Sequence, residues 1–401
     1  MMKQVNMKQR LVIGIFTDVF FPMIDGVVNV VDNYAKKLSL TADVYVFSPN
    51  YGEIENIDKF AYKVIRTKSI KLPLMDYRLS FPSFDTFFEK SMKAIKFDII
   101  HIHSPFSVGN YGINYAKRHN IPLIATLHSQ YKKDFYERSK NAFISELAIG
   151  ELMRRLNRCD RLIAVNDEIA RVFYEYGAKS LPIVIRNGTD LLPLEDEQMA
   201  NDLRKMHHIQ HEDKVLLYVG RLDKIKNVDF LIDSLTILKK REFKFKMIFV
   251  GSGIHEGFMK KRVTLNNLNE NTIFTGRIKD RIELSSYYKV ADLFLLPSLY
   301  DASSLVQVEA ASQHTPTLFI EKAVTASTIC DGVNGYLSSN APEMYAEKII
   351  DIFSKAISHR EICNNAYRDL YLSWNQIVNE LYKNYIDLIS EKLNTVKMHK
   401  D

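Results

Sequence analysis

Short, mostly apolar segments that alternate with helix-like segments limit the possible folds of this chain most strongly. In the helix-like segments, such as residues 27–38 and 110–119, apolar residues recur three and four positions apart. Apolar runs of this kind are typical of strands buried on both faces, and strands that alternate with helices form parallel sheets. In the first half of the chain the runs lie at residues 11–16, 42–47, 98–103, 122–127, 161–165 and 182–185. This half therefore predicts a doubly wound α/β domain.

The same pattern starts again after a polar segment at residues 191–212. A helix-like segment follows at residues 227–240, and a chain of 401 residues is long enough for two domains, since single cores rarely exceed about 250–300 residues. The second set of apolar runs lies at residues 214–219, 245–250, 271–274, 293–296 and 317–320. We expect two Rossmann-like domains that face a central cleft, at residues 1–195 and 196–375, followed by a helix and tail at residues 376–401. Ligands of such sheets bind beyond the carboxyl ends of the strands.

Composition excludes several classes of protein. No run of 18 apolar residues is present, so we expect no membrane span, and the polar first ten residues predict no signal peptide. The cysteines Cys159, Cys330 and Cys363 lie far apart. This spacing fits neither a disulfide framework nor a zinc site, and it suits a reducing cytoplasm.

Charge is distributed unevenly between the two halves. Residues 1–190 carry 27 Lys and Arg against 20 Asp and Glu, whereas the remaining residues carry 27 against 28. A basic first half suits phosphates, an anionic membrane or nucleic acid, and it also suits a mildly basic solvated surface. The chain lacks a recognised nucleic-acid motif, so we do not expect nucleic acid as a partner.

Two groups of residues at strand ends in the first half are candidates for ligand contacts. Asp25-Gly26-Val27 opens a helix after the first strand, where a glycine forms a turn or lets N–H groups approach an anion. The G-x-G-x-x-G fingerprint is absent, which disfavours NAD. His101 and His103 share one face of a strand, and His128 follows the next strand as either a ligand contact or a half-buried, hydrogen-bonded histidine. No third metal ligand stands at a suitable spacing, so we expect no zinc.

Charged residues follow two strands of the second half. Arg221 and Lys226 come after residues 214–219, where they converge on a diphosphate or form part of a solvated surface. Asp301 and Glu309 come after residues 293–296. Ser304 between them is a predicted N-cap, which places Asp301 in a loop and Glu309 within a helix. The N–H groups at that helix start favour an anion.

From Leu11 to Trp374 the chain resembles the retaining glycosyltransferases of family 4, also called glycosyltransferase group 1. That family has the two-domain GT-B architecture, which agrees with the fold expected above. The matching motifs are residues 17–27 with Asp25-Gly26-Val27, residues 161–166, residues 185–190, residues 219–221 with Lys226, residues 250–253, and residues 291–310 with Asp301 and Glu309.

The resemblance implies transfer of a hexosyl unit from a nucleotide-sugar. Arg221 and Lys226 would bind the donor diphosphate, Asp301 the sugar and Glu309 the ribose, with His128 beside the sugar. Fixed cations and N–H dipoles would stabilise the leaving group, so no metal or other cofactor is expected. The remaining residues implied to lie near the donor are Gly26, Val27, Gly253, Arg277, Ile278, Ser304 and Leu305.

The chain departs from the family pattern around the donor sugar. Asp301 stands where the family usually has Glu, Ala-Ser-Ser at residues 302–304 replaces Gly-Phe-Gly, and His-Thr-Pro at residues 314–316 replaces Gly-Thr-Pro. UDP-glucose or another UDP-hexose is the expected donor, with GDP-mannose as the alternative. The same departures motivate a second interpretation, a non-catalytic member that stabilises a partner transferase. The four retained charged residues favour an enzyme.

The expected acceptor is lipid-linked or a polysaccharide, in glycolipid, capsule or cell-wall synthesis. Residues 68–78 and 87–96 mix basic and apolar side chains, with Lys90, Lys93 and, more loosely, Lys96 along one helical side. This segment suits docking on an anionic membrane, or packing as an ordinary amphipathic helix. Residues 131–138 suit an acceptor entrance or a surface loop. We expect a cytoplasmic protein that docks peripherally on the inner membrane face.

Overall fold

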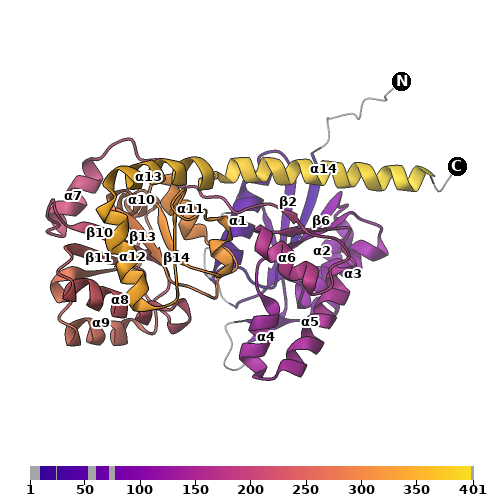
Figure 1. Ribbon diagram of the computed structural model, residues 1–401. Coiled ribbons are helices and arrows are strands. Elements are labelled where there is room, and N and C mark those ends of the chain that lie inside the picture. Colours follow the sequence, from indigo (N-terminus) through magenta and orange to yellow (C-terminus); the bar gives the residue numbers. More distant parts are fainter. Residues whose placement is uncertain (1–9, 24, 53–59, 72–76, 399–401) are drawn as a thin grey trace. The chain divides into compact units, whose positions relative to one another are not determined.

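The computed structural model describes residues 10–23, 25–52, 60–71 and 77–398 (Figure 1). The chain forms two compact units: Met1–Asn187 with Trp374–Asp401, and Gly188–Ser373. The sequence pattern predicts domain boundaries at residues 195/196 and 375/376, whereas the structure divides the chain after Asn187 and after Ser373. Within the described part of the chain, every helix is too short or too polar to cross a lipid bilayer.

The first unit is built on a seven-stranded parallel sheet with the order β3-β2-β1-β6-β7-β8-β9. The direction of the strand order reverses between β1 and β6, which is where open α/β sheets bind ligands. The strands are β1 (Val12–Phe16), β2 (Asp43–Pro49), β3 (Lys63–Thr67), β6 (Ile99–Ile102), β7 (Leu123–Leu127), β8 (Arg161–Ala164) and β9 (Ile183–Val184). A separate antiparallel pair consists of β4 (Ser69–Lys71) and β5 (Arg78–Ser80).

Four helices of the first unit begin at side-chain caps that the sequence supplies, which are Asp25, Asp85, Asn141 and Asn166. The elements are α1 (Gly26–Leu38), η1 (Pro82–Phe84), α2 (Thr86–Ala94), α3 (Ser107–Arg118), α4 (Tyr131–Ser139), α5 (Ala142–Leu156), α6 (Asp167–Glu175) and α14 (Trp374–Met398).

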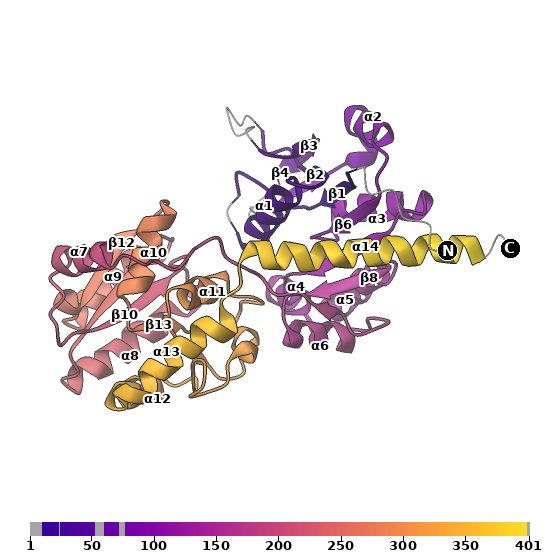
Figure 2. The ribbon, with the colours of Figure 1, turned by 90° about the horizontal axis from the view of Figure 1, so that it is seen from above.

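The last helix, α14, belongs to the first unit although it ends the chain (Figure 2). The Trp374 ring meets the edge of Tyr34 on α1 with centroids 5.8 Å apart. The Tyr385 hydroxyl lies 2.6 Å from Nδ1 of His101 on β6. Both contacts are buried, so α14 is an integral layer of this unit.

The second unit is built on a six-stranded parallel sheet with the order β12-β11-β10-β13-β14-β15, which reverses between β10 and β13. Its strands are β10 (Lys214–Val219), β11 (Phe245–Val250), β12 (Thr272–Gly276), β13 (Leu293–Leu296), β14 (Thr317–Ile320) and β15 (Tyr336–Ser338). Its helices are α7 (Gln198–Met206), η2 (Lys224–Lys226), α8 (Val228–Lys240), α9 (Glu256–Leu265), η3 (Asn269–Asn271), α10 (Arg281–Val290), α11 (Leu305–Ser312), η4 (Val324–Thr328), α12 (Pro342–Ser354) and α13 (Ala356–Leu370).

Both faces of the second sheet are buried, which explains why its strands are apolar throughout. Leu216 and Tyr218 of β10 pack in one core with α8 and α12, whereas Val215 and Leu217 pack in the other with α10. Each fully buried side chain of this size contributes about 1.5–3 kcal/mol. The two sheets confirm the predicted fold class of two Rossmann-like halves.

Some local predictions differ from the structure. Lys96 does not extend the helical row of Lys90 and Lys93, because α2 ends at Ala94. The chain becomes extended at Ile95 so that Phe97 reaches the core, where its ring lies 5.8 Å from that of Phe47.

Two further segments take forms that the sequence patterns left open or did not indicate. Residues 131–138 lie in helix α4 and do not form a surface loop. Part of the segment expected at the domain join forms α7, which contributes buried Ala200 and Leu203 to the second unit. Residues 72–76, within the basic segment at 68–78, lie outside the described residues.

Candidate functional site

The carboxyl ends of β10, β11 and β12 are joined by main-chain hydrogen bonds. The Gly220 N–H donates to Val250 O at 3.0 Å, and the Gly251 N–H donates to Gly276 O at 2.8 Å. Gly251 has φ of +137°, and a Cβ at this position would lie 1.9 Å from Gly220 O. Only glycine fits both the conformation and the space. The three strand ends therefore form a closely packed floor of main chain.

Gly253 continues this floor beside the loop that carries Arg221. A Cβ on Gly253 would lie 2.3 Å from Leu222 O, so the two loops approach as closely as main chain allows. The His255 N–H donates to the same carbonyl at 3.0 Å. This places the predicted residue Gly253 directly against the loop of the predicted residue Arg221.

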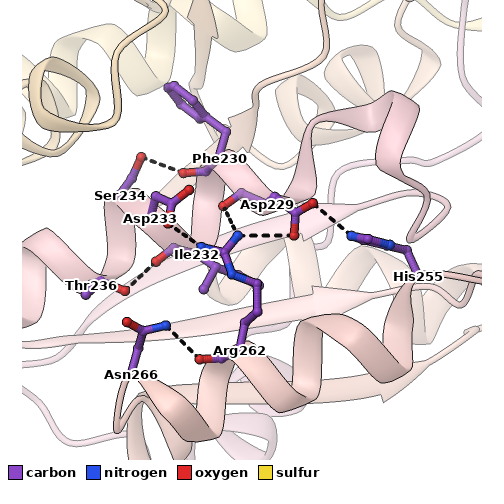
Figure 3. Close-up of polar contacts among 9 residues, drawn as sticks. All are labelled: Asp229, Phe230, Ile232, Asp233, Ser234, Thr236, His255, Arg262 and Asn266. Carbon is purple, nitrogen blue, oxygen red and sulfur yellow. Dashed lines mark hydrogen bonds and ion pairs between the residues drawn. The ribbon is translucent and has the colours of Figure 1, made fainter.

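A charged cluster fixes α9, and with it this glycine loop, against α8 (Figure 3). The Asp229 carboxylate of α8 binds His255 Nε2 at 2.8 Å and Arg262 Nη1 at 3.2 Å. Arg262 Nη2 also pairs with Asp233 one turn further along α8. The carboxylate partners raise the pKa of Arg262 against the opposing effect of its burial. By fixing α9 on α8, the cluster also restrains the Gly253 loop that leads into α9.

Lys226 and Asp301 lie together at the same edge of the sheet. The Lys226 ammonium on η2 forms an ion pair with Asp301 Oδ1 in the loop after β13, and the two side chains are 19% and 21% exposed. Asn227, with φ of +59°, donates its side-chain N–H to Pro297 O at 3.2 Å. This bond ties the start of α8 to the end of β13, which keeps the ion pair in register.

Arg221 has a fixed main chain and an extended side chain. The Tyr218 hydroxyl donates to Arg221 O at 2.9 Å. The guanidinium is 63% exposed and lies 3.4 Å from Asp223. Arg221 is therefore an exposed cation on an anchored loop.

Glu309 is a buried carboxylate with both oxygens engaged. Oε1 accepts a hydrogen bond from Arg281 Nη2 at 2.8 Å, and Oε2 accepts one from the Tyr288 hydroxyl at 2.9 Å. Arg281 also pairs with Asp190. Burial first, and then Glu309, raises the pKa of Tyr288 well above its usual range, so this hydroxyl is a donor at neutral pH.

The start of α11 confirms the predicted cap. Ser304 Oγ accepts from the Gln307 N–H at 3.1 Å, Asp301 lies in the loop before the helix, and Glu309 lies within it. Leu305 is the first helical residue, and first-turn N–H groups have no acceptor inside their own helix. This end of α11 therefore presents donors beside the loop of Asp301.

The other two predicted residues of this unit follow β12. Arg277 is exposed, and Ile278 packs against the core formed by β10 and α10. The loop that carries them leads into α10, whose first residue is Arg281. They lie at the same sheet edge as Gly253, because β12 neighbours β11.

Arg281, Tyr288 and Asp190 were missed by sequence reasoning. Arg281 occupies the first position of a helix capped by Asp280, where a cation opposes the helix dipole. Tyr288 lies two turns later on the same side of the helix. The spacing of seven residues in the sequence indicates that Arg281 and Tyr288 lie on one side of the helix. It does not indicate their common partner Glu309, because that contact depends on how α10 packs against α11.

In the first unit, Asp18 locks the end of β1 to the start of α3. Its carboxylate accepts hydrogen bonds from the Ser107 hydroxyl and the Val108 N–H, each at 2.7 Å. A Cβ on Gly109 would lie 1.8 Å from Ser104 O, so glycine is required for this close approach. Burial raises the pKa of Asp18, and the hydrogen-bond donors act in the opposite direction.

A pocket of about 370 Å³ opens beside this junction. Apolar and aromatic side chains form most of its wall. Asp134 also lines the pocket, and burial raises the pKa of its carboxyl group to about 6. The predicted residue Val27 lines it, whereas Gly26, which opens α1, is exposed and does not. The residues that line it include Val27, His103, Phe106, Tyr131, Asp134 and Phe135.

Histidines at the ends of β6 and β7 form a neutral group in which His101 and His103 are buried and His128 is half-buried. His101 and His103 share a face, as predicted, with ring centroids 4.2 Å apart. His103 Nδ1 lies 2.9 Å from His128 Nε2. Burial lowers the pKa of His128 to about 3, so its imidazole is neutral at physiological pH. Ser129, rather than His128, lines the pocket. Across the described residues, no group of three His, Cys, Asp or Glu is arranged to hold a metal ion.

Family models match both units. The model described as Glycosyltransferase Family 4 matches residues 24–191, and the model described as Glycosyl transferases group 1 matches residues 199–369. Together they cover most of the chain.

Curated relatives match over nearly the same length. An alpha-monoglucosyldiacylglycerol synthase of Acholeplasma laidlawii is 26% identical over 404 residues, covering 95% of this chain and 99% of the relative. The protein of the same name from Streptococcus pneumoniae is 27% identical, covering 81% and 74%. A GDP-mannose-dependent alpha-mannosyltransferase of Corynebacterium glutamicum is 25% identical, covering 94% and 89%.

Solved structures share the fold. Anabaena Alr3699/HepE in complex with UDP superimposes with a TM-score of 0.76 at 17% identity, covering 94% of this chain and 100% of that one. Sucrose-phosphate synthase of Thermosynechococcus elongatus gives a TM-score of 0.74 at 18% identity, covering 96% and 100%.

Proposed function

The chain belongs to glycosyltransferase family 4, and from this premise we propose that it is a retaining hexosyltransferase that uses a nucleotide-sugar donor. The observation that carries the proposal is the set of charged groups gathered at one sheet edge of the second unit: Arg221, Lys226, Asp301 and Glu309. These are the residues that the family motif matches. A relative named alpha-monoglucosyldiacylglycerol synthase, of which the match covers 99%, supports the same class of reaction.

Lys226 is proposed to stabilise the departing nucleoside diphosphate. Cleavage of a sugar–diphosphate bond places negative charge on the leaving group, and preorganised cations and N–H donors lower the barrier to that step. The Lys226–Asp301 pair supports this role, because the two charges are already held together. When a diphosphate pairs with Lys226, the Asp301 carboxylate is released to accept hydrogen bonds from sugar hydroxyls. Arg221 and the N–H groups of Ser304 and Leu305 add donors to the diphosphate.

The nucleoside is proposed to lie over the floor of main chain. Glu309 accepts hydrogen bonds from the ribose hydroxyls, and Gly253, Arg277 and Ile278 line the nucleotide. His128, Gly26 and Val27 are the proposed contributions of the first unit, at the sugar and the phosphates. The acceptor attacks from the face that the leaving group departs, so neither carboxylate acts as a nucleophile. No metal or other cofactor takes part in this scheme.

UDP-glucose is the proposed donor and a glycerolipid the proposed acceptor. Two relatives are named glucosyldiacylglycerol synthases, and one structural neighbour holds UDP. The relative named for GDP-mannose supports GDP-mannose as the alternative donor. The pocket beside Phe106, Tyr131 and Phe135 offers an apolar wall that suits the apolar part of a lipid.

Docking on the inner face of the cytoplasmic membrane is proposed to go with a lipid acceptor. Phe84 and Phe87 are 83% and 68% exposed, and Lys90 and Lys93 follow them on α2. Exposed aromatic side chains beside lysines suit an anionic bilayer surface. A polysaccharide acceptor, or a role as the stabilising partner of another transferase, is the competing interpretation.

A donor panel tests the proposal. UDP-glucose, UDP-galactose, UDP-N-acetylglucosamine and GDP-mannose are titrated by calorimetry, and nucleotide release is followed with and without vesicles that contain diacylglycerol. Binding of one donor, with release accelerated by diacylglycerol, is the expected result, and the anomeric signal of the product by NMR tests retention. A chain that binds none of the four supports the non-catalytic interpretation, with the altered residues 302–304 as the cause.

A further inference from the structure

Arg281 holds a position that a basic residue does not usually take. It is the first residue of α10, where the helix dipole disfavours a cation, and 43% of its side chain is exposed. Two carboxylates, those of Asp190 and Glu309, offset this cost. A single atom, Nη2, bonds to both.

We infer that Arg281 is a positioning residue, which orients the Glu309 carboxylate to accept both hydroxyls of the donor ribose. This inference rests on the proposed function. It assigns a role in nucleotide recognition to a residue that does not itself touch the ribose.

The lone pairs of Glu309 determine which further donors its carboxylate can accept. A carboxylate has about four acceptor directions, two on each oxygen. Arg281 occupies one direction on Oε1 and Tyr288 occupies one on Oε2, at 2.8 and 2.9 Å. Each oxygen keeps one direction for a further donor. Two adjacent acceptors in one plane match two vicinal hydroxyls, which is the arrangement of the ribose 2′ and 3′ positions.

The two donors also fix the rotation of the carboxylate. The Glu309 side chain is 11% exposed, and the Tyr288 ring behind it is fully buried. Thr315 Oγ1 donates to Tyr288 O at 2.7 Å, which holds that residue on α10. With one donor on each oxygen, the carboxylate cannot turn without losing a hydrogen bond. Bonds to charged groups are stronger than neutral ones, so Arg281 provides the larger part of this restraint.

Arg281 is itself held from the opposite side. Asp190 lies in a segment whose Thr189 N–H donates to Leu372 O at 2.8 Å and whose Leu191 N–H donates to Thr189 Oγ1 at 3.1 Å. The guanidinium is thus placed between an anchored acid and Glu309. A side chain that only balanced charge would not need two fixed partners on one nitrogen.

The experiment compares a nucleotide with its deoxy analogue. Dissociation constants of UDP and 2′-deoxy-UDP are measured by calorimetry for the wild type and for Arg281→Met, with GDP and 2′-deoxy-GDP used if the donor panel selects GDP-mannose. The wild type is expected to prefer the ribonucleotide by about 10- to 100-fold, the value of a hydrogen bond to a charged group. In Arg281→Met this preference falls to about threefold or less, because UDP binds more weakly while 2′-deoxy-UDP binds almost as before.

Control variants separate positioning from stability. Lys289→Met removes a positive charge from the same helix, where it lies 3.9 Å from Glu197, and should leave both dissociation constants within about twofold. Arg281→Lys keeps the charge but lacks the planar fork and should give an intermediate preference. If Arg281→Met does not yield folded protein, Tyr288→Phe removes the donor on the other oxygen and should reduce the preference in the same direction.

The outcomes are distinct. A reduced preference in Arg281→Met, with Lys289→Met unchanged, supports the inference. An unchanged preference, or equal weakening of both nucleotides, overturns it and leaves a purely structural ion pair. A wild type that binds the ribonucleotide and its deoxy analogue equally overturns the inference while the proposed function stands. A wild type that binds no nucleotide overturns both.

Discussion

The strand order reverses at the same point in the two sheets, but the side chains at their carboxyl edges differ in charge. In the second unit the polar side chains are charged and paired, as in Lys226 with Asp301 and Arg281 with Glu309. In the first unit they include the neutral imidazoles of His101, His103 and His128, and a pocket with a mostly apolar wall opens beside His103. The charged edge suits an anionic nucleotide, and the neutral edge suits an acceptor with apolar parts. Each variant below tests one side of this contrast.

The largest effect is expected from Lys226→Ala. Loss of a preorganised charge at a developing anion lowers kcat by about 10²- to 10³-fold. The dissociation constant of UDP should change much less, because the ammonium acts mainly on charge that develops in the transition state. Steady-state kinetics with the donor selected by the panel and calorimetry with UDP measure the two effects.

A matched control comes from the same short helix. Lys224 is exposed on η2, two residues before Lys226, and Lys224→Ala should keep kcat within about threefold of the wild type. If Lys226→Ala turns over donor as fast as Lys224→Ala does, Lys226 has no role in the leaving-group step.

Gly251→Ala tests whether the charged edge depends on its floor of main chain. The new Cβ would lie 1.9 Å from Gly220 O in a conformation with φ of +137°. Strain and the forced shift of the loop should lower the free energy of unfolding by about 3 kcal/mol. Denaturant unfolding followed by circular dichroism measures this free energy.

The control is Gly257→Ala, on α9 with open space around its Cβ, which should change stability by less than about 1 kcal/mol. Equal stability of the two variants would show that the floor tolerates a side chain.

Local sequence patterns were enough for most of the parallel strands and for part of the charged edge, but they did not indicate β3 or β15. The strands β10, β13 and β14 have the predicted limits, because a continuous apolar run ended by polar residues is a local signal. The Ser304 cap was readable for the same reason. The contacts of Arg281 with Glu309, and of Tyr385 with His101, were not readable. They join residues far apart in the chain, and their geometry depends on how helices pack on the sheet.

The apolar character of the first unit can be tested at a membrane. Phe84→Ser combined with Phe87→Ser should weaken binding to vesicles of phosphatidylglycerol and phosphatidylcholine by about tenfold, since partial insertion of the rings recovers only a part of the about 1.5–3 kcal/mol that full burial of a Phe side chain contributes. Sedimentation with sucrose-loaded vesicles measures the partition. The control is Phe143→Ser with Leu147→Ser on α5, whose side chains are 70% and 60% exposed. Weaker binding by the control pair alone would assign docking to α5 and remove it from α2.

The smallest effect is expected from pH, and it tests whether the histidines of the first unit are neutral. Burial lowers the pKa of His101 and of His128 to about 3, against about 6.5 in an unfolded chain. Between these two values the unfolded state binds more protons, so stability is fully present above pH 6.5 and decreases as the pH falls towards 3. From pH 7 to pH 5.5 each of these histidines should lower the free energy of unfolding by about 1 kcal/mol.

His128→Asn should therefore remove about 1 kcal/mol of this pH-dependent loss of stability, whatever its effect on stability at pH 7. Trp374 is the single tryptophan and is buried in this unit, so its fluorescence reports the transition. A wild type and a His128→Asn variant that lose equal stability between the two pH values would mean that His128 titrates as an ordinary histidine, and the neutral edge would lose its main support.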